Sequence, residues 1–90
     1  MNMFEAVQFI EPSVGEVPEE TVLGDFDDEL DAVAVVRSAR FDFTTSGRDQ
    51  YAWWIVRKRG ESLASFIADS KSDKEFVLDL RSGELVELHS

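Results

Sequence analysis

Only one histidine, His89, and no cysteine occur among the 90 residues, which limits the chemistry that the side chains can perform. A Ser-His-Asp triad needs a histidine held between two partners, and a residue beside the C-terminus is not held in that way. Without cysteine there is no thiol nucleophile, thiolate zinc site or disulfide. We therefore predict no catalytic residues and expect that the protein is not an enzyme.

The acidic run from Asp25 to Asp31 carries oxygen ligands at alternating positions, as a calcium-binding loop does. An EF-hand loop also needs glycine at its sixth position and glutamate at its twelfth, where this chain has Leu30 and Val36. The spacing of the 19 acidic residues singles out no pair for general acid–base catalysis. We predict no metal site and no cofactor.

The net charge of −10 is confined to the N-terminal part of the chain. No basic residue precedes Arg37, whereas residues 37–90 carry nine acids and all 9 bases. Such asymmetry is typical of an interaction segment, although acids that only keep a surface soluble produce the same pattern. The interaction interpretation predicts that a basic protein binds at Asp25, Asp27, Asp28, Glu29 and Asp31. The charge also argues against nucleic acid and anionic membranes as partners.

Aromatic residues form the second candidate site, because Tyr51, Trp53 and Trp54 precede the basic cluster Arg57-Lys58-Arg59. Neighbours on a strand point to opposite faces, so Trp53 and Trp54 cannot enter the same core. If one face of the sheet is open, one tryptophan becomes an anchor for a partner. If the N-terminal segment covers that face, both are mostly buried, which the sequence favours. Arg57 and Arg59 are expected to pair with the acidic segment.

The N-terminal elements are predicted to be helical or irregular. Residues 3–10 fit a helical spacing of apolar positions, and Pro12 would end that helix. Residues 12–24 contain two prolines and two glycines and predict an irregular connection.

From residue 32 the pattern indicates strands. Residues 32–43 alternate apolar and polar positions and predict one long strand with a bulge near Val36. A competing helix from Asp25 would enter this strand, with its first acids suited to the helix dipole. Residues 44–49 predict a hairpin connection, because they contain Ser46-Gly47.

The remaining strands are predicted at residues 51–59 and 63–68, followed by a polar loop at 70–74 and a final hairpin. In that hairpin, a three-residue loop with Gly83 in the left-handed conformation pairs Leu78 with Val86 and Phe76 with Leu88. Together these elements predict one small α+β domain over residues 1–90. About four antiparallel strands within residues 32–89 are expected to be covered on one face by the helical or irregular segment 1–31.

The tryptophan-bearing segment Trp54–Val56 and the hairpin Phe76–Val86 with its Asp79-x-x-x-Gly83-Glu84 turn resemble the closing hairpin of PepSY-type and cystatin-like domains. The resemblance covers less than half of the chain, and no function is carried over from it.

These observations predict a non-enzymatic protein-interaction or inhibitory module that presents an acidic N-terminal face to a basic partner. The alternative is a sheet that binds a small ligand or a peptide through Tyr51 and one of Trp53 and Trp54. The first residues, Met-Asn-Met-Phe-Glu, lack the positive flank and apolar run of a signal peptide, and no segment reaches the ~20 apolar residues of a membrane span. We therefore expect a cytoplasmic protein without membrane contact.

Overall fold

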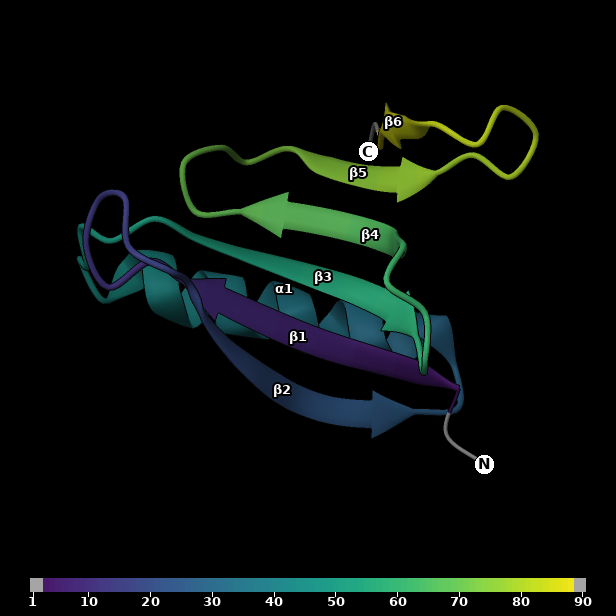
Figure 1. Ribbon diagram of the computed structural model, residues 1–90, viewed down its shortest axis with the longest axis horizontal. Helices are drawn as coiled ribbons and strands as arrows, with labels where there is room; N and C mark the ends of the chain where they lie inside the picture. The colour runs from purple at the N-terminus through teal and green to yellow at the C-terminus, as the bar shows by residue number, and fades with distance from the viewer. Residues whose placement is uncertain (1–2, 89–90) are drawn as a thin grey trace.

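The computed structural model describes residues 3–88 and has an α+β fold, with one antiparallel sheet and one helix (Figure 1). In chain order the elements are β1 (Phe4–Ile10), β2 (Glu19–Phe26), α1 (Glu29–Thr45), β3 (Ala52–Lys58), β4 (Ala64–Asp69), β5 (Glu75–Leu78) and β6 (Leu85–Glu87). The order of strands in the sheet is β2-β1-β3-β4-β5-β6. The first strand of the chain therefore lies next to β3 in the interior of the sheet.

The helix covers one face of the sheet and forms the core with it (Figure 1). Its buried side chains Ala32, Val36 and Phe43 pack against those of β1, β3 and β4. Trp54 is fully buried in this core, where its ring meets that of Phe43 edge-on at 5.5 Å. The indole Nε1 of Trp54 donates a hydrogen bond to Oε1 of Gln8 at 2.9 Å, so its polar atom is satisfied.

Three predictions for the N-terminal half need correction: residues 3–10 contain a strand, residues 19–24 of the expected irregular connection lie in β2, and residues 32–43 lie in a helix. In β1, Ala6 and Val7 are both fully buried although they point to opposite faces, so apolar residues at helical spacing there belong to a strand in the interior of the sheet. The competing helix is the correct alternative, although it begins at Glu29 and continues to Thr45. Its core positions recur at helical spacing: Ala32, Val36, Ala39 and Phe43.

Because a strand replaces the first predicted helix and a helix replaces the first predicted strand, both the number of strands and the element that covers the sheet differ from the prediction. The sheet has six strands and not about four, because residues 4–26 supply β1 and β2. The helix, and not the N-terminal segment, covers the face. The expected hairpin at residues 44–49 is wrong as well, since α1 continues to Thr45 and a connection to β3 follows. The strands predicted at 51–59 and 63–68 are confirmed as β3 and β4, and the loop at 70–74 joins β4 to β5.

The C-terminal hairpin is confirmed, but its register differs from the prediction. Val77 lies opposite Val86 and Leu78 opposite Leu85. The amide of Asp79 also donates to the carbonyl oxygen of Glu84, so the loop between the paired residues consists of the four residues 80–83 and ends at Gly83. Gly83 has the expected left-handed conformation, with φ of 74°. The predicted register placed Phe76 and Leu78 on the covered face, whereas Val77 packs against the core and Glu75 accepts hydrogen bonds from Arg37 of α1.

Candidate partner-binding surface

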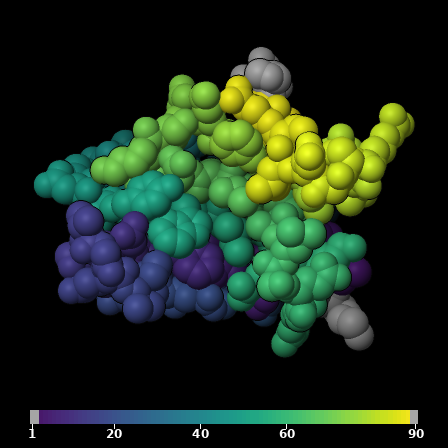
Figure 2. Space-filling model, turned by 45° about the horizontal axis from the view of Figure 1, so that its top comes forward, coloured from purple at the N-terminus to yellow at the C-terminus, as the bar shows by residue number. Residues whose placement is uncertain are grey.

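The face of the sheet opposite α1, here called the open face, carries no covering element among the described residues (Figure 1). Because Trp54 points into the core, its neighbour Trp53 points to the open face. Trp53 is half-buried, so the prediction that both tryptophans are mostly buried holds for Trp54 and only partly for Trp53. In Figure 2 the teal residues around position 50 reach the surface between the purple and blue N-terminal residues and the green residues of the later strands.

One row of side chains crosses four strands of the open face, and we call it the aromatic row. Phe9 of β1 lies opposite Glu20 of β2 on one side and opposite Trp53 of β3 on the other. Trp53 lies opposite Asp69 of β4. The rings of Phe9 and Trp53 are stacked, with centroids 5.2 Å apart and planes 12° apart. The row therefore reads acid, aromatic, aromatic, acid.

A second row, parallel to the first, is apolar: Val22, Val7, Ile55, Ile67 and Phe76. Although it lies on the open face, Val7 is fully buried and Ile55 is 8% exposed. Arg57 accounts for part of this cover, because its guanidinium lies 3.2 Å from Glu5 and 3.6 Å from Glu20. Glu5 lies directly opposite Arg57, whereas Glu20 lies in the aromatic row. The Arg57 side chain therefore extends across the open face, over the apolar row, to reach Glu20.

The pairing of Arg57 with the acidic N-terminal segment was predicted and is confirmed. For Arg59 the structure gives a backbone contact, in which its amide donates to the carbonyl oxygen of Met3 at 2.8 Å. Both contacts attach β1 to the end of β3.

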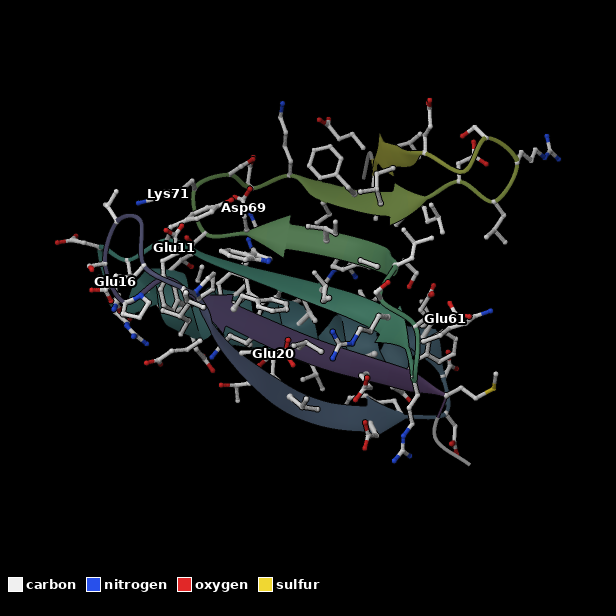
Figure 3. The ribbon with its side chains drawn as sticks, viewed as in Figure 1. Glu11, Glu16, Glu20, Glu61, Asp69 and Lys71 are labelled. Atoms are coloured by element: carbon white, nitrogen blue, oxygen red, sulfur yellow. The ribbon has the colours of Figure 1, made fainter. Side chains whose placement is uncertain are left out.

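Tyr51, the residue before β3, adds a third ring beside the aromatic row. The centroid of its ring lies 5.4 Å from that of Trp53. Burial raises the pKa of the Tyr51 hydroxyl above its usual value, and the negative charges of Asp69 and Glu11 raise this pKa further. Figure 3 shows Glu11, Asp69 and Lys71 gathered at this end of the sheet. Lys71 is anchored there by a 3.3 Å hydrogen bond from its Nζ to the carbonyl oxygen of Asp49.

The five acids predicted to bind a partner lie at the other end of the strands, around the start of α1. Asp28 is the N-cap residue, and its side chain accepts a 3.0 Å hydrogen bond from the amide of Leu30. Glu29 and Asp31 occupy the first turn, where negative charge stabilises the helix dipole. Asp25 is an exposed residue near the end of β2, and Asp27 lies in the turn before the helix. Asp28, Glu29 and Asp31 thus have a structural role in starting α1, apart from any role in binding.

Of the aromatic candidates, the structure brings Tyr51 and Trp53 together on the open face and places Trp54 in the core. Sequence reasoning missed Phe9, Glu20 and Asp69 as members of this site. The pairing of β1 with β3 joins residues far apart in the chain, and no local pattern specifies it. Alternation within β1 was the only available signal, and the helical interpretation of residues 3–10 concealed it.

Within residues 3–88, no group of three or more metal-ligating side chains is found, and no helix is long and apolar enough to cross a membrane. His89 lies outside the described residues. Comparison with protein-family models, with curated proteins and with solved structures found no match to this chain.

Proposed function

We propose that the protein is a non-enzymatic interaction module whose open face binds a basic segment of a partner protein. The observation that carries this proposal is the aromatic row, in which the stacked pair Phe9 and Trp53 lies between the carboxylates of Glu20 and Asp69. An aromatic surface bordered by carboxylates suits an arginine or lysine side chain. The ring faces attract the cation, and the acids, of which Glu20 also pairs with Arg57, neutralise its charge.

Long-range electrostatics support the same partner chemistry. A net charge of −10 attracts basic proteins and raises their rate of association, and it repels acidic ones. The acids around the start of α1 contribute to this field, although they lie away from the row. A partner held in this way has part of its basic surface covered, so binding would inhibit any activity that uses that surface.

A second candidate function is the binding of a small ligand beside Tyr51. An open pocket of about 400 Å³ adjoins this residue and is also lined by Glu11, Val14, Gln50 and Lys71. Its size falls within the range of small-molecule sites, but its walls are exposed on the surface. The pocket adjoins the aromatic row, so a peptide side chain is an equally suitable occupant.

The test uses synthetic peptides of equal length that are basic, neutral or acidic, titrated into the protein at several salt concentrations. We expect only the basic peptides to bind, with an affinity that falls as salt rises, because screening weakens charge attraction. Trp53→Ala should weaken binding about tenfold or more, as loss of a tryptophan anchor does. The matched control is Phe41→Ala on α1, whose ring is 67% exposed away from the open face and should not matter.

Two results would contradict the proposal. One is an affinity for basic peptides that does not change with salt. The other is binding by Trp53→Ala that equals that of the unmodified protein, provided that Trp54 fluorescence shows the core intact.

A further inference from the structure

The edge of the sheet formed by β2 has a backbone that is paired on one side only. This strand has eight residues and borders β1, and no strand formed by residues 3–88 lies beyond it in the sheet. Residues 19–22 are exposed and pair in regular register with residues 10 to 7 of β1. The register shifts only after Val22, between Val7 and Ala6 of β1. A regular edge of this kind presents backbone N–H and C=O groups to which another strand can add. The opposite edge, β6, has only three residues.

The charge at this edge determines which strand can add. Glu19 and Glu20 begin β2, Asp25 lies near its end, and Glu16 lies in the preceding loop. Charges on edge strands commonly prevent association. Here they all have the same sign, so they repel a second copy of this chain, with its net charge of −10, and attract a basic strand. The edge is thereby selective.

We propose that an extended basic segment of the partner adds to β2 as a seventh strand of the sheet. This inference rests on the proposed function and specifies how the partner is held. Its main-chain hydrogen bonds would supply affinity, and alternate side chains would supply specificity.

The register of the sheet predicts the sequence pattern of that segment. Glu20 and Val22 point to the open face, in the aromatic and apolar rows respectively. Side chains that lie beside them on an added strand continue these two rows. The segment should therefore carry a basic residue beside Glu20 and, two residues away, an apolar residue beside Val22. A second basic residue, next in sequence to the first, would face Glu19.

The experiment uses a ten-residue peptide with this pattern and a second peptide with identical side chains and alternate backbone N-methyl groups. N-methylation removes the donors that pair with β2 but keeps charge and composition. We expect the first peptide to slow hydrogen exchange about tenfold or more at those β2 amides that point to the outer edge, since they become paired. The N-methylated peptide should bind about tenfold more weakly.

Variants of the protein give an independent comparison. Glu19→Lys should weaken binding of the first peptide about tenfold, because it places like charge beside the added strand. The matched control is Glu61→Lys, which makes the same change in net charge on an exposed residue at the far end of the sheet (Figure 3) and should change the affinity less than threefold.

The outcomes separate the two proposals. Binding that shifts the indole N–H signal of Trp53 but leaves β2 exchange unchanged overturns the edge inference and keeps the proposed function. Protection of β2 without any effect at Trp53 overturns binding at the open face and, with it, the register that this inference takes from the aromatic row. If no basic peptide binds, both fail.

Discussion

Tyr51 is the only tyrosine of the chain, so its ionisation can be followed directly by absorbance. Burial and the charges of Asp69 and Glu11 raise its pKa, and we expect its titration midpoint to lie above the ordinary value of about 10. Asp69→Asn should lower the midpoint, because it removes one of these charges. Its side-chain oxygen can still accept the hydrogen bonds that the amides of Lys71 and Ser72 donate to Asp69.

The same shift affects stability at high pH. The folded protein keeps the Tyr51 proton at pH values where the unfolded chain has lost it. The free energy of unfolding should therefore fall as the pH rises from about 10 through the folded pKa. Tyr51→Phe should lack this part of the decrease in urea unfolding. An unchanged pH dependence in that variant would contradict the assignment.

At single residues, the sequence predicted those features that depend on local geometry. Alternation along β3 correctly separated Trp53 from Trp54, and charge complementarity identified Arg57 as a partner of the acidic segment. The aromatic row was not predictable, because it requires the pairing of β1 with β3 and of β3 with β4. Asp69 gives no local sign that it will lie beside a tryptophan.

At the level of elements, the helix α1 depends on its N-cap. Asp28 accepts the amide of Leu30, so Asp28→Ala should lower the free energy of unfolding by about 1 kcal/mol. Asp28→Asn should retain most of that stability, because its side-chain oxygen can accept the same hydrogen bond. Urea unfolding at pH 7 measures both. Equal losses in the two variants would show that charge and not capping matters at this position.

The exchange of helix and strand in the N-terminal half has a physical cause. In α1, Val33, Val35 and Val36 gave residues 32–43 a strand-like composition, yet the spacing of the core positions is helical. In β1, burial on both faces removed the alternation that identifies a strand. β3 was recognised because its length and flanking turns agree with its composition. In β1 and α1, composition and periodicity favoured different secondary structures, and burial in the tertiary structure determined which one formed.

For the whole molecule, the net charge of −10 opposes compactness. Salt should relieve this repulsion more than it weakens the few exposed ion pairs, such as Lys74 with Glu87. We expect the melting temperature to rise when NaCl is increased from about 0.01 M to about 0.15 M, as the Debye length falls from about 30 Å to about 8 Å. KCl serves as the control and should act equally. A fall in melting temperature would show that ion pairs outweigh the repulsion.

The central position of β1 has a consequence for synthesis on the ribosome. Its inner neighbour β3 ends at Lys58, so the inner edge of β1 has no partner until that much of the chain has emerged. At ~5–20 residues per second, this delay lasts roughly 2–10 s. Once Asp31 has emerged, the nascent chain carries all ten acids that precede Arg37, and no base has yet emerged. Neighbouring chains on one messenger repel each other during this interval, which protects an unpaired strand from joining the wrong copy.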